Sequence, residues 1–280
     1  MSFGLPPRKD QPQLTYGGYL KVSDLISLQQ LHSDPPQHDE MLFIVIHQVY
    51  ELWFKELLHE LDTIIERLDR DQPLAAHKLV RRCIEIERVL VSQIEVLETM
   101  MPVDFLAFRD HLMPASGFQS HQFRELEYVS GLKDARFLKN YDPGSNERAF
   151  LEARLARPTL VDAFYAMLRR RGFELPMSST DNREACDSAL KQRLGELKRI
   201  YQDAEKHYDL FLLTESLIEY DEMFSMWRLR HVMMVERMIG SKSGTGGSEG
   251  AAYLKKTVDR KFFPDLWELR TELSKREDGR

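Results

Sequence analysis

One histidine near the end of the chain, His231, lies on an apolar helical stripe. Phe224, Trp227, Met234 and Met238 share this stripe, because these positions are spaced by three and four. A neutral imidazole on an apolar helix face is the proximal ligand that a five-coordinate haem needs, and Trp227 would pack beside the porphyrin. The same spacing also describes a core helix whose single histidine is hydrogen-bonded to a neighbour. The spacing alone leaves both interpretations open.

A second stripe places His47 among the aromatic residues Phe43, Tyr50 and Phe54. Between Met41 and Phe54 the pattern is apolar nearly all round, so we expect this helix to be buried on every side. A buried ring nitrogen needs a hydrogen-bond partner. His47 is therefore either a core histidine bonded to a backbone carbonyl, or a base or donor that faces a pocket.

An arginine and a glycine-rich segment add polar chemistry. Arg109 lies between aromatic residues in DFLAFR, where a guanidinium is costly unless it pairs with a carboxylate. Its planar fork suits a two-point bond to such a group, from the protein or from a substrate. Segment 240–250, GSKSGTGGSEG, directly follows the His231 helix. It is either a flexible linker or a loop that approaches a ligand closely, with Thr245 offering its hydroxyl.

The elements that must position these residues are helices almost throughout, since no run of residues alternates as a strand does. The predicted helices span 22–31, 38–69, 73–101, a short piece after Pro102, 122–130, 147–156, 160–170, one or two helices over 181–239, and two short helices after the glycine-rich segment. No linker separates two halves of the chain. We therefore expect an all-α, single-domain helical bundle over residues 19–280, with a site in its interior. Residues 1–18 form a polar N-terminal arm.

Composition excludes several classes of protein. The 280 residues carry 39 Lys and Arg against 45 Asp and Glu, a net charge of −6, so we expect no nucleic-acid-binding face. The longest apolar run, 41–46, is far shorter than the roughly 20 residues of a membrane span. The first residues lack the apolar core of a signal peptide, and Cys83 and Cys186 form no Cys-x-x-Cys pair for covalent haem attachment. We expect a cytoplasmic protein.

Several blocks of the chain together resemble the tryptophan 2,3-dioxygenases, haem enzymes that open the indole ring of L-tryptophan. These blocks are LTYGGYL from Leu14, FIVIHQVYELWFKELLHEL from Phe43, FLAFRDHLMPASGFQSHQFR from Phe105, and MWRLRH from Met226 through the GTGGS of the glycine-rich segment. They occur in the family's order at both ends and in the middle of the chain. Residues 133–198 carry little of the resemblance.

The resemblance implies roles for individual residues. It makes His231 the axial ligand of haem b, places Trp227 and Ser116 beside the cofactor, and makes His47 a catalytic distal residue that contacts the indole N–H. The substrate-binding residues that it implies are Phe43, His47, Phe105, Arg109 and Thr245, with Tyr16, Tyr19 and Leu20 contributed by a neighbouring subunit. Arg109 pairs with the substrate carboxylate and Thr245 binds the amino-acid end. Phe105 is Tyr in some members, so this pocket lacks that hydroxyl.

The resemblance also implies an activity and an assembly. The reaction inserts both atoms of O2 across the indole C2–C3 bond of L-tryptophan and gives N-formyl-L-kynurenine, the first step of tryptophan degradation by the kynurenine route. The enzyme is expected to be a homotetramer in which the arm of one subunit completes the pocket of another.

Two other functions stay open at this point. Glu56-Leu57-Leu58-His59 is one Glu-x-x-His step, and a di-iron carboxylate bundle needs two of them. No other Glu precedes a His by three, which disfavours that site. The remaining alternative is a helical interaction module, in which His47 and His231 belong to the core and the arm binds a partner.

Overall fold

The computed structural model describes residues 14–176, 183–244 and 250–273. The helices are α1 (Tyr16–Leu20), α2 (Val22–Leu25), α3 (His38–Asp69), α4 (Pro73–Leu97), α5 (Pro102–Arg109), α6 (His121–Ser130), α7 (Asn146–Ala156), α8 (Leu160–Arg170), α9 (Arg183–Gln202), α10 (Tyr208–Ile239), α11 (Ala251–Lys255) and α12 (Pro264–Glu272), with short 3-10 turns at Asp110–Leu112, Gly117–Gln119 and Ala135–Asn140. The described residues include no strand. The prediction of a single-domain, all-α fold is confirmed.

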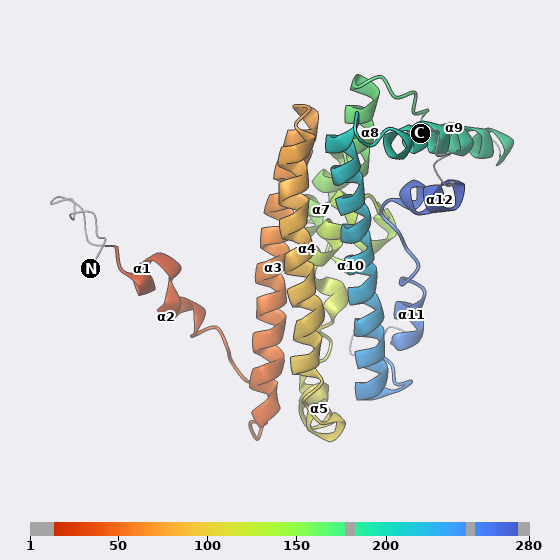
Figure 1. The fold of residues 1–280 in the computed structure, drawn as a ribbon. Helices are drawn as coiled ribbons and strands as arrows, with labels where there is room; N and C mark the ends of the chain where they lie inside the picture. The colour runs from red at the N-terminus through yellow and green to blue at the C-terminus, as the bar shows by residue number, and fades with distance from the viewer. Residues whose placement is uncertain (1–13, 177–182, 245–249, 274–280) are drawn as a thin grey trace.

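Three long helices, α3, α4 and α10, run side by side and form the core of the bundle, with α4 in the middle (Figure 1). α6 and α8 pack against α3, and α9 packs with α12 at one end of the molecule (Figure 1). The apolar stripes read from the sequence account for this packing. Leu61, Ile64 and Leu68 of α3 are fully buried, as the three-and-four spacing predicts.

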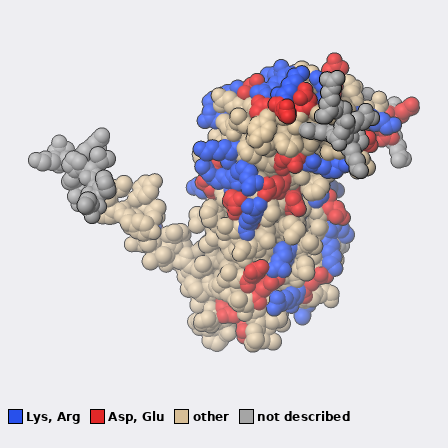
Figure 2. Space-filling view, in the orientation of Figure 1, with Lys and Arg blue, Asp and Glu red and all other residues tan. Residues whose placement is uncertain are grey.

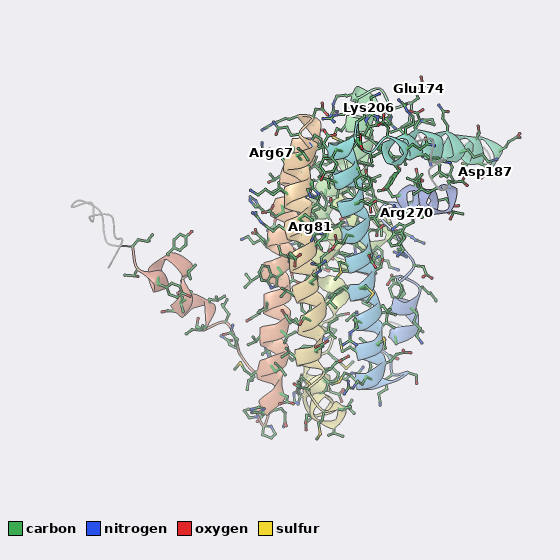
Figure 3. The ribbon with its side chains drawn as sticks, in the orientation of Figure 1. Arg67, Arg81, Glu174, Asp187, Lys206 and Arg270 are labelled. Atoms are coloured by element: carbon green, nitrogen blue, oxygen red, sulfur yellow. The ribbon has the colours of Figure 1, made fainter. Side chains whose placement is uncertain are left out.

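Polar side chains fasten the upper end of the bundle. Arg270 of α12 donates to the Tyr201 hydroxyl of α9 at 3.1 Å and to the Glu215 carboxylate of α10 at 2.6 Å (Figure 3). Arg81 of α4 pairs with Glu219 of α10 farther down. These contacts join helices that are distant in sequence, so the end formed by α9 and α12 is tied to the core.

Several predicted helix boundaries are correct, and the errors have local causes. The helices at 38–69 and 160–170 match α3 and α8 residue for residue. The predicted helix at 22–31 ends instead at Leu25, and the one at 73–101 ends at Leu97. Met101 precedes Pro102 and adopts an extended conformation (ψ 143°), because proline disfavours a helical residue before it. The span 181–239 forms two helices, α9 and α10.

The prediction that α3 is buried on every side between Met41 and Phe54 is wrong. Met41, Val45 and Leu52 expose 41%, 39% and 51% of their surfaces. Exposed apolar residues also occur on α4 and α10, namely Val89, Val96, Met226, Leu229 and Met233. Figure 2 shows a broad surface with few charges over the lower part of the bundle. A surface of this kind is typical of protein–protein contact.

The first two helices project away from the bundle (Figure 1). Neither α1 nor α2 contains a buried residue. The chain that follows them is fastened to α3, because the buried carboxylate of Glu40 accepts the backbone N–H groups of His32 and Ser33 at 2.7 and 3.0 Å. The arm therefore extends from a fixed base without packing on its own subunit.

None of the helices that the structure describes combines the length and the apolarity that crossing a membrane requires.

Candidate active site

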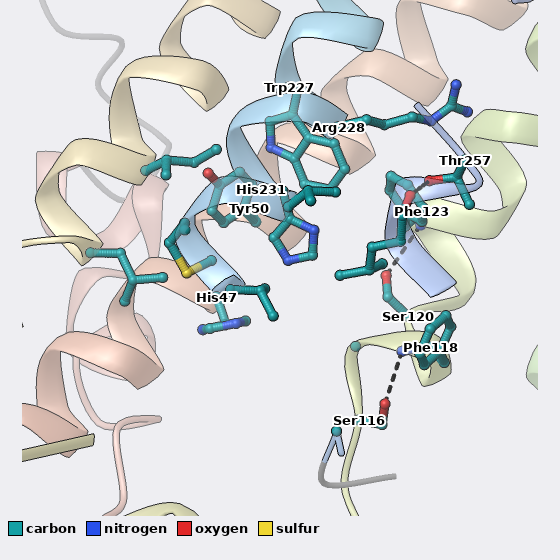
Figure 4. Close-up of a pocket in the computed structure, with 18 of the residues that line it drawn as sticks. His47, Tyr50, Ser116, Phe118, Ser120, Phe123, Trp227, Arg228, His231 and Thr257 are labelled. Atoms are coloured by element: carbon teal, nitrogen blue, oxygen red, sulfur yellow. Dashed lines mark hydrogen bonds between the residues drawn. The ribbon is translucent and has the colours of Figure 1, made fainter. Parts of the chain in front are cut away.

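A cavity of about 330 Å³ lies inside the bundle, between α3, α4, α5, α6, α10 and α11 (Figure 4). Its walls are mainly apolar and aromatic. The residues predicted for the site that line it are Phe43, His47, Phe105, Arg109, Ser116, Trp227 and His231. The long helices thus bring together residues that are up to 188 positions apart in the sequence, from Phe43 on α3 to His231 on α10 (231 − 43 = 188).

The His231 ring projects into this cavity from α10 (Figure 4). It stacks on the Trp227 ring, with centroids 5.2 Å apart and planes 8° apart. No residue in the described part of the chain hydrogen-bonds to the imidazole. Burial, with a smaller contribution from His47, lowers the pKa of His231 to about 4, so the ring is neutral at pH 7. The core interpretation required a hydrogen-bonded ring, and none of the described residues provides that bond to His231.

The His47 ring is held from its own helix. Its Nδ1 atom lies 2.7 Å from the Phe43 carbonyl oxygen, which fixes Nδ1 as the donor and directs Nε2 away from that bond. Burial lowers the pKa of His47, against the opposing effect of this hydrogen bond. His47 is therefore neutral at pH 7 and presents an acceptor to the cavity that it lines. The expected bond to a backbone carbonyl is present, but His47 is exposed and lines a pocket, so it is not a core residue.

Aromatic rings cover the wall beside His47. The Phe43 ring lies 4.0 Å from the His47 ring and is stacked 5.7 Å from Phe105, measured between centroids. Phe108 closes the group from behind with an edge contact to both phenylalanines and is fully buried. This wall offers a flat apolar ring a set of aromatic contacts.

Arg109 ends α5 and lines the cavity. It donates from Nη2 to the backbone carbonyl of Ser243. Among the described residues no carboxylate pairs with it, so of the two expected partners the protein carboxylate is not found and the substrate carboxylate stays a prediction. The charge of the guanidinium is thus not neutralised by a protein group there.

A turn at Ser116–Ser120 forms another part of the wall (Figure 4). The Ser116 hydroxyl accepts the Phe118 N–H at 3.3 Å, and the Ser120 hydroxyl caps α6 by accepting the Phe123 N–H at 3.2 Å. Tyr141 holds the turn from outside, since its hydroxyl donates to the Ser120 carbonyl at 3.1 Å. Residues beyond 133, where the resemblance is weak, therefore support the site.

One end of the cavity is polar and cationic, which the sequence reasoning did not foresee. The carboxylate of Glu127 accepts from Arg124 and, at 2.8 Å, from Arg228. Arg260 and a second carboxylate, Glu51, also line the cavity. The described wall thus carries four arginines, Arg109, Arg124, Arg228 and Arg260, against two carboxylates, so it favours an anionic ligand. The available signal was Arg228, which interrupts the apolar run beside Trp227.

Four predicted site residues are not among the described residues that line the cavity. Tyr16, Tyr19 and Leu20 belong to the projecting arm, expose 79%, 70% and 44% of their surfaces, and do not line the cavity of their own chain. Thr245 lies outside the described residues. Their proposed roles therefore stay predictions.

Within the described ranges, no three His, Cys, Asp or Glu side chains gather closely enough to hold a metal ion. His59, the histidine of the Glu-x-x-His step, is exposed on α3. The described part of the chain thus offers no support for a di-iron site.

Comparison with known proteins agrees with the resemblance. The family model described as tryptophan 2,3-dioxygenase matches residues 7–172 and 146–273. Proteins named tryptophan 2,3-dioxygenase are similar over nearly the whole chain: one from a Nocardioides species is 50% identical, covering 93% of this chain and 95% of its own, and one from Herpetosiphon aurantiacus is 46% identical, covering 93% and 98%. A third, from Myxococcus xanthus, is 43% identical and covers 93% and 90%. A cavity that carries the residues quoted for the resemblance, in a chain so similar to these proteins, establishes that this chain belongs to the tryptophan 2,3-dioxygenase family.

Proposed function

We propose that this chain is a haem-dependent dioxygenase that inserts both atoms of O2 across the indole C2–C3 bond of L-tryptophan and forms N-formyl-L-kynurenine. The observation that carries the proposal is the neutral imidazole of His231, which faces a cavity without a hydrogen-bond partner among the described residues, in a chain of this family. A metal ligand must be a deprotonated ring nitrogen, and a pKa of about 4 keeps His231 in that form.

The chemistry of the cavity wall suits haem b. His231 would hold the iron, with Trp227 and Ser116 beside the macrocycle, and the cationic end formed by Arg124, Arg228 and Arg260 suits its anionic carboxylates. When bound, the haem supplies the iron that binds and activates O2. The protein supplies binding, orientation and a dry site.

The other residues address the substrate. L-tryptophan is a zwitterion with a flat apolar ring, and Phe43 and Phe105 offer that ring aromatic contacts. The Nε2 atom of His47 would accept the hydrogen bond of the indole N–H, because Nδ1 is committed to the Phe43 carbonyl. Arg109 would take the carboxylate in a two-point bond, and Thr245 would bind the amino-acid end. Tyr50 has no role as an acid, since its hydroxyl donates to the Leu90 carbonyl at 2.7 Å.

The arm supports a proposal about assembly. A segment with no buried residue gains little from its own subunit, so α1 and α2 need another surface to be stable. The lower part of the bundle, whose surface carries few charges in Figure 2, would be buried by the same association. We therefore propose a homotetramer in which Tyr16, Tyr19 and Leu20 complete the pocket of a neighbouring subunit.

The direct test is product formation by the haem-loaded protein. With L-tryptophan and O2 we expect the absorbance of N-formyl-L-kynurenine to rise as O2 is consumed. One molecule of product should form for each molecule of O2. Loaded protein that consumes neither substrate would contradict the proposal. An interaction module would have no pigment to load.

A further inference from the structure

The guanidinium of Arg109 is already held in the protein without ligand. Its Nη2 atom donates to the backbone carbonyl of Ser243, a residue that follows α10. Arg109 lies at the end of α5, and the two residues are 134 positions apart. Arg109 lines the cavity, and so does Gly244, the residue that follows Ser243. The hydrogen bond between Arg109 and Ser243 therefore joins two walls of the cavity.

Ser243 belongs to a segment that glycines shape, and we define residues 240–244 with Gly250 as the loop stem. Gly240 ends α10 with φ 61° and ψ −132°, and Gly250 precedes α11 with φ 61° and ψ −134°. Residues with a Cβ atom rarely adopt this conformation. The two ends of the loop stem therefore both depend on glycine.

Gly250 has a second constraint that Gly240 does not have. A Cβ atom at Gly250 would lie 2.6 Å from the carbonyl oxygen of Lys242, whereas one at Gly240 would meet nothing within 4 Å. Real Cβ atoms do not approach an oxygen so closely. Only glycine at position 250 lets the chain close against Lys242, next to Ser243.

The loop stem is also fixed to the bundle. The Gly240 N–H donates to the Glu236 carbonyl at 2.9 Å, and the Lys242 N–H donates to the Ile239 carbonyl at 3.2 Å. Lys255 of α11 pairs with the Glu236 side chain at 2.5 Å. The Ser243 carbonyl is thus a backbone acceptor on a supported frame.

The bond to Ser243 leaves Arg109 able to bind a carboxylate. A guanidinium has two edges that can bind a carboxylate at two points, and Nη2 contributes one hydrogen to each. Ser243 occupies one of these hydrogens, so the other edge stays complete. A side chain that is already fixed loses less conformational freedom on binding, which is typically worth about two- to tenfold in affinity.

We propose that the loop stem positions Arg109 for a carboxylate ligand through the Ser243 carbonyl, and that Gly250 is the positioning residue on which this depends. The inference rests on the proposed function only in naming that carboxylate as the one of L-tryptophan. The state of Arg109 before a ligand binds is independent of that function.

The first test concerns the protein without substrate. Hydrogen–deuterium exchange of the peptide that contains residues 240–244 is measured in the haem-loaded protein and in Arg109→Ala. We expect faster exchange in this variant, because the loop stem loses its bond to α5. Arg237→Ala, at an exposed arginine near the same end of α10, should leave the exchange unchanged. Equal exchange in Arg109→Ala and the parent protein would overturn the inference, whatever the enzyme's substrate.

The second test measures discrimination between ligands. Calorimetric titration of the ferric enzyme gives the ratio of its affinity for L-tryptophan to its affinity for tryptamine, which lacks the carboxylate. We expect Gly250→Ala to lower this ratio about two- to tenfold, with little change in the affinity for tryptamine. Gly172→Ala is the matched control, since Gly172 also has a positive φ (85°) and lies in a different turn, after α8.

An unchanged ratio in folded Gly250→Ala would overturn the inference, as would an equal loss in Gly172→Ala. A parent enzyme that binds tryptamine as tightly as tryptophan would instead contradict the substrate role of Arg109 in the proposed function. In that case the hydrogen–deuterium exchange of the substrate-free protein would decide by itself whether the loop stem positions Arg109.

Discussion

At the scale of single residues, the two histidines of the cavity differ in what holds their rings. His47 is oriented by the Phe43 carbonyl at 2.7 Å, so one nitrogen is committed and the other is presented. His231 is oriented by stacking on Trp227 and has no such hydrogen bond among the described residues. A ring without a polar partner in an apolar cavity is costly unless a ligand supplies one. This contrast supports the proposal that His231 holds the cofactor and His47 contacts the substrate.

Arg109 gives the first prediction at this scale. We expect Arg109→Ala to raise the KM for L-tryptophan about ten- to a hundred-and-fifty-fold, because a charged hydrogen bond is worth about 1.5–3 kcal/mol. Steady-state kinetics of the haem-loaded enzyme measures the effect, with tryptamine as the comparison substrate. A variant that loses as much activity on tryptamine as on tryptophan would show that Arg109 does not recognise the carboxylate.

Glu87 gives the second prediction, on pH. It is 1% exposed on α4, and neither of its carboxyl oxygens has a hydrogen-bond partner among the residues that the structure describes. Burial, reinforced by the Asp221 carboxylate and opposed by Arg228, raises the pKa of Glu87 well above its ordinary value. The folded state then keeps a proton that the unfolded state releases above pH 4 to 5, so this group destabilises the fold as pH rises.

We therefore expect the free energy of unfolding to fall less between pH 5 and pH 8 in Glu87→Gln than in the parent protein. Urea unfolding of the haem-loaded protein at both pH values measures the difference. Glu85→Gln, at an exposed carboxylate on the same helix, is the control. If Glu87→Gln and the parent protein lose equal stability over this range, Glu87 is not protonated in the fold.

At the scale of elements, α10 carries His231, so the position of α10 along its axis relative to the neighbouring helices must be fixed. Asp221, nearly three turns earlier on α10 and fully buried, accepts the backbone N–H groups of Phe262 and Phe263 and the indole N–H of Trp267, each at 3.0 Å. These donors belong to the segment that leads into α12 and to α12 itself. One carboxylate therefore fixes the C-terminal segment onto the helix that bears the site.

Asp221→Ala should accordingly destabilise the protein by more than about 3 kcal/mol, because two buried backbone donors and the half-buried Trp267 indole lose their acceptor at about 1–3 kcal/mol each. Urea unfolding measures this loss, and Glu222→Ala at the neighbouring exposed position is the matched control. A loss below about 1 kcal/mol would mean that other groups hold the C-terminal segment.

The helices themselves were largely predictable from the sequence. Stripes spaced by three and four and prolines at first turns are local signals, so α3 and α8 have the predicted boundaries. Burial was less predictable, since an apolar helix face such as that at Leu52 packs on the same or on another molecule with equal ease. The bond from Arg109 to a backbone carbonyl was not predictable, because such an acceptor has no side-chain signature.

At the scale of the whole molecule, the projecting arm and the sparsely charged lower part of the bundle both favour association with further subunits. Tyr16 and Tyr19 expose 79% and 70% of their surfaces on helices that their own bundle does not cover. Burial of such large aromatic side chains by a partner would be favourable. The described single chain is therefore the repeating unit of the proposed assembly.

Complementation between subunits tests the role of the arm. We expect the double variant Tyr16→Ser and Tyr19→Ser to be inactive, because neighbouring pockets stay incomplete. His231→Ala should also be inactive, but its arm is intact. Co-expression of the two should restore activity in mixed assemblies, where an intact arm meets an intact site. Activity assays combined with sedimentation of the purified mixtures measure this. Mixed assemblies without recovered activity would show that the arm does not act between subunits.

The proposal that His231 is the iron ligand is tested most directly by the absorption spectrum of the ferrous, haem-reconstituted protein. We predict a Soret band of five-coordinate, histidine-ligated haem in the parent protein and in His59→Ala, whose histidine is exposed on α3. His231→Ala should lack this band and retain its helical circular dichroism. A His231→Ala protein that binds haem with an unchanged band would show that His231 is not the iron ligand.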